Sequence, residues 1–395
     1  MKKLPAFLTF TFLFSFMLQA QWTTLSSGTT DNLYDVYFTS NDIGYVVGEN
    51  GLIMKTVDGG VNWTTQTSGV SGYLHGIVFI DDTTGYAVGQ SGTVLKTINA
   101  GTNWVSLNTG TSTNLLDVFF VDLNTGYAVG WNGKVIKTTN AGATWTTVNS
   151  GINTGSNLTG VQFTSANTGY VTGTSGYLYK TVNGGTSWSQ ENISSGSLNL
   201  FELHFISANT GFVVGENTSF FKTTDGGANW SSVSGGGGQT KGVFFTSSTT
   251  GYIVGNSSSS GIVRETTDGG NNWTVAVNNV ANLNNVMFPS QNTGYAVGDN
   301  GTILKKQTVT GVNQMESAEI AFYPNPAKEN IYFNLGMIAD NIQMKIYDAS
   351  GKLIFQNKIA QGKTIALNVR DFNNGLYFAQ FEFGNKRKVL KFMVE

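Results

Sequence analysis

The segment DVYFTSNDIGYVVGENGLIMKTVDGGVNW, Asp35 to Trp63, contains the pattern that decides the fold. Related segments follow it, and their final tryptophans lie 41, 41, 43, 42 and 43 residues apart. Each segment divides into four short runs of β-branched and aromatic residues, separated by turn formers such as TSND, EN and DGG. Four antiparallel strands in a repeat of about 40–45 residues are typical of a propeller blade. The pattern therefore predicts an all-β propeller.

The two ends of the repeat region complement each other. The Gly-Tyr core of the unit occurs seven times, once as Gly211-Phe212, but the last unit, from Asn285, has no fourth strand. The N-terminal segment QWTTLSSG, residues 21–28, resembles a fourth strand on its own, and Trp22 lies 41 residues before Trp63. We therefore expect the N-terminal strand to complete the last blade, which gives seven blades over residues 21–306 and removes an open sheet edge.

The first twenty residues, MKKLPAFLTFTFLFSFMLQA, have two lysines, a short apolar run and a small residue at Ala20. This layout predicts a signal peptide, residues 1–20, that is cleaved near Ala20. The apolar run is short for a membrane span and no other long one follows, so we expect no span in the mature chain.

Composition excludes several kinds of function. The chain has no Cys, two His, 12% charged residues and a net charge of −2. A nucleic-acid partner would need a dense basic patch, so none is expected. Transition-metal sites draw mainly on Cys and His, so no metal and no cofactor are expected.

The segment TVDGGVNW, Thr56 to Trp63, has a hydroxyl residue, an Asp, two Gly and a Trp at fixed spacing. The Asp predicts an Asx turn, and the glycines permit positive φ. Half of the six units carry Asn in its place, so we interpret this position as structural: Asp58, Asn99, Asn140, Asn183, Asp225, Asp268. A basic column precedes it, which we expect to be solvated: Lys55, Lys96, Lys137, Lys180, Lys222, Arg264, Lys305.

These units resemble the Asp-box, or BNR, family. Their fuller pattern, with NTGYAVG followed by ILKT and DGG-NW, is similar to the propellers of photosystem II assembly and stability factors over about residues 21–306. The resemblance implies the fold and says little about function. Sialidases also carry Asp boxes, but their chemistry needs an arginine cluster, and Arg264 is the only arginine of this repeat region.

One face of the predicted propeller carries acids that could form a hydrolytic pair. Glu49, Glu216 and Asp299 lie in loops between second and third strands, and three more acids lie near the starts of inner strands: Asp35, Asp117, Glu202. Two of them could act as general acid and base at a separation of about 5–9.5 Å. The interpretation we favour is that they are rim charges.

Trp131 occupies the same loop position in the third blade, where the other blades have Glu49, Gln90, Thr174, Glu216, Asn256 and Asp299. A tryptophan in a short polar loop is a candidate anchor for a sugar or a protein. Tyr73 and His75, at a blade junction, are candidates for the same face. The predicted ligand-binding residues are therefore Trp131, Tyr73, His75, Glu49, Glu216, Asp299.

Beyond Lys306 the texture changes. A linker, residues 307–319, precedes about 75 residues of alternating strands and turns, which predict a small immunoglobulin-like β-sandwich over residues 320–395. YPNP, YDASGKL, NGLYF and a final Lys-rich strand closely resemble the type IX secretion C-terminal sorting domain of Bacteroidetes-type bacteria. The motif residues are Tyr323, Pro324, Asn325, Pro326, Gly351, Gly375. The resemblance implies that the type IX machinery is a partner of residues 320–395 and that the protein is secreted or held at the outer-membrane surface.

We therefore expect a secreted or cell-surface propeller that binds an extracellular glycan or protein, with no reaction assigned. Two alternatives stay open: a glycoside hydrolase that uses paired carboxylates on the propeller face, and a scaffold protein like the assembly factors.

Overall fold

The computed structural model describes residues 21–149, 151–191, 193, 196–217, 219–235, 238–257, 260–307, 321–383 and 386–395. These residues form two compact units, 21–307 and 321–395. The predicted signal peptide and, apart from Gln307, the predicted linker lie outside the described residues. No helix in the described part of the chain is long and apolar enough to cross a membrane.

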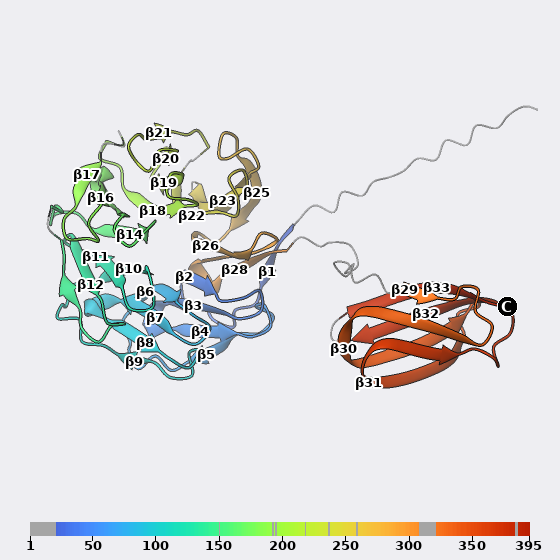
Figure 1. Ribbon diagram of the computed structural model, residues 1–395. Coiled ribbons are helices and arrows are strands. Elements are labelled where there is room, and N and C mark those ends of the chain that lie inside the picture. The colour runs from blue at the N-terminus through green and yellow to red at the C-terminus, as the bar shows by residue number, and fades with distance from the viewer. Residues whose placement is uncertain are drawn as a thin grey trace, which may run out of the picture. The chain divides into compact units, whose positions relative to one another are not determined.

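The first unit is a ring of seven four-stranded antiparallel sheets, the blades (Figure 1). The inner strands are β2 (Leu33–Phe38), β6 (Leu74–Phe79), β10 (Leu115–Phe120), β14 (Leu158–Phe163), β18 (Leu200–Phe205), β22 (Gln239–Phe245) and β26 (Leu283–Ser290). The second strands are β3 (Gly44–Gly48), β7 (Gly85–Gly89), β11 (Gly126–Gly130), β15 (Gly169–Gly173), β19 (Gly211–Gly215), β23 (Gly251–Ser257) and β27 (Thr293–Gly298).

The third strands are β4 (Ile53–Thr56), β8 (Val94–Thr97), β12 (Lys134–Thr138), β16 (Leu178–Thr181), β20 (Phe220–Thr223), β24 (Ser260–Thr266) and β28 (Ile303–Gln307). The outer strands of blades one to six are β5 (Thr64–Gln66), β9 (Val105–Ser106), β13 (Thr146–Thr147), β17 (Ser189–Glu191), β21 (Ser231–Ser232) and β25 (Thr274–Val280). Short 3-10 turns follow four of the second strands: η1 (Glu49–Gly51), η2 (Gln90–Gly92), η3 (Thr174–Gly176) and η4 (Asp299–Gly301).

The predicted closure is confirmed. The N-terminal strand β1 (Gln21–Leu25) pairs antiparallel with β28 and becomes the outer strand of the seventh blade. Trp22 lies opposite Lys306 in this register and is 8% exposed. The chain therefore closes its ring with residues from both ends of the repeat region.

Neighbouring blades are joined by stacked aromatic rings. Phe38, at the end of β2, stacks on Tyr295 of the preceding blade with ring centroids 3.7 Å apart, and Trp63 meets Phe38 edge-on at 6.1 Å. Gly44 is required here because a Cβ at its position would lie 2.4 Å from the Phe38 ring. The same stack recurs at each junction: Phe79–Tyr45, Phe120–Tyr86, Phe163–Tyr127, Phe205–Tyr170, Phe245–Phe212 and Phe288–Tyr252. The repeated Gly-Tyr and Phe positions therefore supply the contacts that join each blade to the next.

The Asp boxes form the Asx turns that their sequence predicts. Asp58 Oδ1 accepts hydrogen bonds from the Thr56 hydroxyl at 2.8 Å and from the backbone N–H of Asn62 at 2.9 Å. In the third blade Asn140 Oδ1 accepts the corresponding bonds from Thr138 at 3.0 Å and from the N–H of Thr144 at 2.9 Å. An amide oxygen thus serves this turn as well as a carboxylate does.

The expectation that the basic column is solvated is wrong, because its lysines donate hydrogen bonds to the neighbouring blade. Lys55 Nζ donates to the carbonyl of Ala100, in the box of the next blade, at 2.7 Å and lies 5.5 Å from the centre of the Tyr45 ring. Five other lysines make the equivalent bond: Lys96 to Ala141, Lys137 to Gly184, Lys180 to Gly226, Lys222 to Gly269 and Lys305 to Gly59. Each box therefore receives the ammonium group of the blade before it.

The assignment of Arg264 to this column is wrong. Each column lysine pairs with the aromatic residue of its second strand, as Lys55 does with Tyr45. In the sixth blade the residue opposite Tyr252 is Glu265, and Arg264 lies opposite Ile253. Arg264 has the residue type of the column, but the register places the column position one residue further along, at Glu265.

The second unit is a small β-sandwich made of β29 (Ala321–Tyr323), β30 (Asn330–Asp348), β31 (Leu353–Asn368), β32 (Gly375–Phe383) and β33 (Lys386–Val394). The first part of β30 pairs with β29 and its last part pairs with β32, while β31 follows it along both parts. The long hairpin therefore contributes to both layers. Phe333, Phe381 and Phe392 are fully buried in the core between them.

The segment with the sorting motif is hydrogen-bonded to the last strand, β33. Asn325 Oδ1 accepts a hydrogen bond from the backbone N–H of Met393 at 2.8 Å, and the N–H of Ala327 donates to the carbonyl of Met393 at the same distance. The peptide bonds before Pro324 and Pro326 are cis. Gly351 has φ 84° in the turn between β30 and β31, where a left-handed residue favours glycine.

Candidate functional site

Trp131 projects from a rigid loop. Its backbone N–H donates to the carbonyl of Asn114 at 3.0 Å, and the N–H of Asn132 donates to Asn157 Oδ1 of the next blade at 3.2 Å. The side chain of Trp131 is nevertheless 45% exposed. The loop is therefore held on both sides while the indole is free to make a contact.

The acids at the equivalent loop position hold their own blades together. Glu49 accepts hydrogen bonds from the N–H and the side-chain amide of Asn32 and from the hydroxyl of Tyr34. The other two acids have similar partners: Glu216 with Asn199, and Asp299 with Asn282 and Asn284. These acids lie on blades one, five and seven, and each stabilises the chain just before or within the inner strand of its own blade.

Tyr73 and His75 belong to an aromatic cluster. The Tyr34 ring lies 5.9 Å from Tyr73 and 5.1 Å from His75, and the Tyr34 hydroxyl reaches Glu49 at 3.1 Å. Burial lowers the pKa of His75 to about 4, so its imidazole is neutral at neutral pH. The structure therefore groups Tyr73, His75 and Glu49 around Tyr34, whereas Trp131, Glu216 and Asp299 stand on other blades of the same face.

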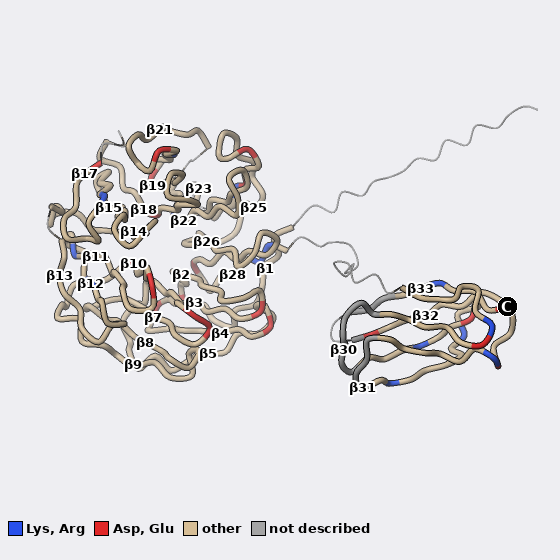
Figure 2. Tube along the Cα trace, in the orientation of Figure 1, with Lys and Arg blue, Asp and Glu red and all other residues tan. Residues whose placement is uncertain are grey.

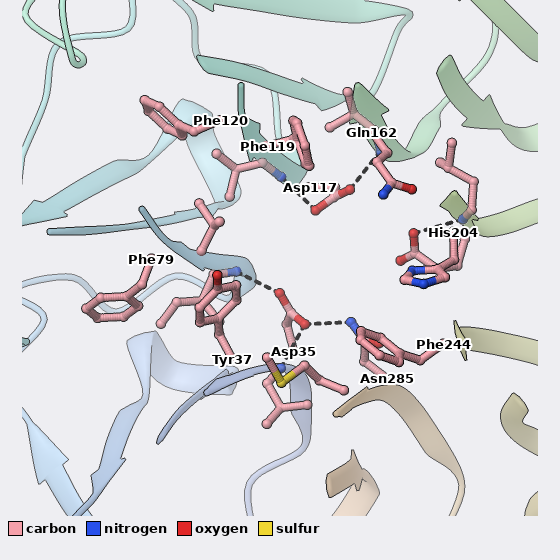
Figure 3. Close-up of a pocket in the computed structure, with 18 of the residues that line it drawn as sticks. Asp35, Tyr37, Phe79, Asp117, Phe119, Phe120, Gln162, His204, Phe244 and Asn285 are labelled. Atoms are coloured by element: carbon pink, nitrogen blue, oxygen red, sulfur yellow. Dashed lines mark hydrogen bonds between the residues drawn. The ribbon is translucent and has the colours of Figure 1, made fainter. Parts of the chain in front are cut away.

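A cavity of about 560 Å³ lies where the seven inner strands meet (Figure 3). Every inner strand has a register shift near its start. The residue after this shift is an acid in blades one, three and five and a glycine in blades two, four and six: Asp35, Gly76, Asp117, Gly160, Glu202, Gly242, and Asn285 in blade seven. The carboxylates and the glycines thus alternate around the channel.

The alternation has a structural basis. Asp35 accepts a hydrogen bond from the N–H of Ile77 in the next blade, and Asp117 accepts one from Val161, both at 2.7 Å. The intervening glycines make room for the acid of the following blade, since a Cβ at Gly76 would lie 3.2 Å from Asp117 Cα and one at Gly160 would lie 3.1 Å from Glu202 Oε1. Because seven is odd, two polar blades meet at the closure, and there Asn285 Nδ2 donates to Asp35 at 2.5 Å.

Burial changes the acidity of these carboxyls. It raises the pKa of Asp35 to about 6, despite the hydrogen bonds that the carboxylate accepts. Burial and the nearby charge of Asp35 raise the pKa of Asp117 to about 7, and burial together with Asp117 raises the pKa of Glu202 well above its usual range. The channel therefore favours the protonated forms of these carboxyls, because burial and the neighbouring acids disfavour the anions.

Sequence reasoning missed the second ring of channel residues. Two positions after each acid or glycine the inner strands place mainly aromatic and apolar side chains toward the cavity: Tyr37, Val78, Phe119, Gln162, His204, Phe244, Met287. Figure 3 shows several of them around the same space as Asp35 and Asp117. An alignment of the seven inner strands would have revealed this ring, because it lies at a constant offset.

Charged residues are few elsewhere on the propeller, as Figure 2 shows. Among the described residues no group of three His, Cys, Asp or Glu side chains is arranged to hold a metal ion.

Comparison with known proteins identifies both parts of the chain. Residues 14–111, 98–194 and 148–236 match the family described as photosynthesis system II assembly factor YCF48, and together they cover more than half of the chain. Residues 321–395 match the secretion system C-terminal sorting domain. No curated protein matches the sequence.

Solved structures with the same fold include YCF48 from Cyanidioschyzon merolae, at 21% identity and a TM-score of 0.62, covering 74% of this chain and 100% of that one. A YCF48 solved with a D1 peptide bound has 17% identity and a TM-score of 0.59, over 75% and 99% of the two chains. The GH74 xyloglucanase from Xanthomonas campestris has 13% identity and a TM-score of 0.60, over 94% and 69%. At these identities the likeness concerns the fold.

Proposed function

This chain belongs to the family of the photosynthesis system II assembly factor YCF48, and we propose that its propeller is a binding module that holds a polypeptide segment on the face carrying Trp131. The C-terminal domain is a type IX sorting domain, so the protein is exported to the cell surface or beyond it. The polypeptide is therefore an extracellular one. We also infer that the leader, residues 1–20, is removed near Ala20.

The observation that carries the proposal is the exposed indole of Trp131 on a loop fixed by hydrogen bonds from two of its backbone N–H groups. At the same position Glu49, Glu216 and Asp299 accept bonds within their own blades, a role that an indole does not fill. Tryptophan is enriched among residues that dominate binding energy, and a preorganised anchor loses little entropy on binding.

The cluster of Tyr34, Tyr73 and His75 adds a second apolar surface on the same face. Because His75 is neutral, the three rings offer contact area without a positive charge. A YCF48 has been solved with a peptide bound, and this supports a peptide rather than a glycan as the ligand. A module of this kind would serve as a scaffold that retains or presents another protein.

The hydrolase alternative receives less support from the geometry. A glycosidase needs two carboxyl groups free to face the sugar. Glu49, Glu216 and Asp299 each accept at least two hydrogen bonds from their own blades. The channel acids Asp35 and Asp117 accept backbone N–H bonds with both oxygens.

The test is an array of extracellular peptides and glycans probed with the exported chain and with Trp131→Ala. We expect peptide binding that weakens about tenfold or more in the variant. Val182→Ala is the matched control, because Val182 is 68% exposed in an Asp box on the opposite face. Equal losses in both variants, or retention of a glycan with no peptide, would contradict the proposal.

A further inference from the structure

The central channel is a second candidate site, separate from the Trp131 face and independent of the proposed function. It combines carboxylates, aromatic rings and a cavity of about 560 Å³, within the range of small-ligand sites. We propose that it binds an alkylammonium group, either the side-chain amine of a lysine or a free aliphatic amine.

The charge of the lining favours a cation. Four acids line the cavity, Asp35, Asp117, Asp122 and Glu202, and the described lining contains no Lys or Arg. His204 does not compensate them, because burial lowers its pKa to about 4. A bound cation would therefore favour the ionised forms of Asp117 and Glu202, which burial and, to a smaller extent, the neighbouring carboxylates disfavour.

Two side chains of β18, Glu202 and His204, each offer an atom that can accept a hydrogen bond from the cation. Glu202 is half-buried and accepts one hydrogen bond, from the N–H of Leu203 to Oε1 at 2.8 Å, and its Oε2 has no hydrogen-bond partner among the described residues. His204 Nε2 lies 3.3 Å from the carbonyl oxygen of Phe245. A carbonyl can only accept, so Nε2 carries the hydrogen and Nδ1 is left as an acceptor.

The walls suit an alkyl stem with a charged end. The centroids of the Phe244 and His204 rings lie 4.5 Å apart, and Tyr37, Phe119 and Met287 belong to the same layer of side chains. Aromatic faces attract ammonium ions, most strongly where water is excluded. An ammonium group has three donors, which match Glu202 Oε2, His204 Nδ1 and one further oxygen.

The lining also indicates the side of access. It extends from Asp35 and Asp117 toward Asp122 and Leu123 in the turn after β10. The residues at the other end of the inner strands, such as Tyr34 and His75, are absent from the described lining. A ligand would therefore enter from the face with the Asp boxes, away from Trp131.

The experiment titrates the chain of residues 21–395 with n-butylammonium chloride and, in parallel, with n-butanol, and follows binding by calorimetry. We expect the amine to bind and the alcohol not to bind. Equal binding of both would show an apolar cavity without selectivity for charge, and binding of neither would also overturn the proposal.

Glu202→Gln keeps the acceptor for Leu203 and removes the charge, so amine binding should weaken about tenfold or more. Asp371→Asn makes the same change of charge on the exposed surface of the C-terminal domain and should leave binding unchanged, as should Trp131→Ala. Amine binding that survives Glu202→Gln would contradict the proposal.

A second variant covers the case in which Glu202→Gln does not fold, which a thermal scan would reveal. Phe244→Leu removes an aromatic wall and should also weaken binding of the amine. Unchanged affinity in Phe244→Leu would count against the site. Short peptides with lysine or norleucine then separate the two sources: lysine-dependent binding indicates a polypeptide side chain, and binding of only the free amine indicates a small metabolite.

Discussion

At every junction a side chain of the third strand hydrogen-bonds to the next blade. It is a donor at the six junctions that end at an Asp box and an acceptor at the junction between blades six and seven. At a boxed junction a lysine donates to the carbonyl of the next blade, as Lys137 does to Gly184. Blade seven has no box, because β1 supplies its outer strand. There Glu265 stands in place of the lysine and accepts hydrogen bonds from Trp22 Nε1 at 2.8 Å and from Lys306 Nζ at 2.5 Å.

The difference shows that the closing strand is more than a copy of the missing strand. A box offers a carbonyl acceptor, so the column needs a donor. The closing blade offers an indole N–H and an ammonium group instead, so the column needs an acceptor. Trp22 also has a hydrogen-bond partner that four of the six box tryptophans lack, since the buried Nε1 atoms of Trp63, Trp104, Trp145 and Trp230 have none among the described residues.

Among the changes considered, deletion of Gln21–Leu25 should cause the largest loss of unfolding free energy. It removes the burial of Trp22, the pairing along β28 and a partner of Glu265. Removal of one buried tryptophan side chain alone costs about 3–5 kcal/mol, so the loss of unfolding free energy should exceed that. Urea unfolding of the deleted chain beside a chain that begins at Gln21 measures it, and equal midpoints would mean that β1 is an ordinary frayed end.

Glu265→Lys should have the next largest effect, although it restores the residue that the other six blades carry. Lys306, whose side chain is 6% exposed, would lose its partner and face a second positive charge. Breaking a buried ion pair costs about 3–5 kcal/mol. Addition of Lys306→Glu should recover part of the stability in the same urea experiment. A Glu265→Lys variant as stable as the unaltered chain would refute the claim that this junction needs an acceptor where the others need a donor.

Lys137→Met tests a boxed junction and should have a smaller effect. The variant loses the ammonium bond at 2.8 Å and the contact with the Tyr127 ring. The carbonyl of Gly184 keeps its bond from the Tyr127 hydroxyl at 2.9 Å, so no acceptor is stranded. We expect a loss of about 1–2 kcal/mol in chemical unfolding. A loss as large as that of Glu265→Lys would mean that the two kinds of junction are equally sensitive.

Asn140→Asp should have the smallest effect, since Asp58 already makes the same turn in the first blade. The carboxylate would accept from Thr138 and from the N–H of Thr144 as the amide does now. No resolvable change in the melting midpoint is expected, whereas Asn140→Ala should lower it. A large decrease with Asp would show that the amide N–H, which donates to Thr144, matters more than the acceptor.

Most of the propeller could be predicted, because its cause is periodic. The spacing of Trp22 from Trp63 is enough to predict closure, and the Gly-Tyr core is enough to count blades. The exception at blade six cannot be predicted from residue type, because Arg264, a basic residue like the column lysines, is adjacent to the true position. The register with Tyr252 shows that Glu265 occupies it.

The candidate sites were harder to predict. The acids of the Trp131 face could be located on loops, but their partners, such as Asn199 for Glu216, depend on how a loop meets the chain before an inner strand. The channel requires the positions of seven strands from separate repeats. Its alternation of acid and glycine is visible in the sequence, yet its meaning depends on contacts between blades such as Asp35 with Ile77.

Hydrogen exchange of the backbone amides in the native state tests the central claim, that β1 and its junction close the ring as an integral part of the propeller. The account predicts that amides of β1 and β28 exchange as slowly as those of the paired strands β11 and β12 in the third blade, and that Glu265→Lys accelerates the first pair selectively. Rapid exchange along β1 in the unaltered chain, with β28 and the other blades still protected, would contradict it.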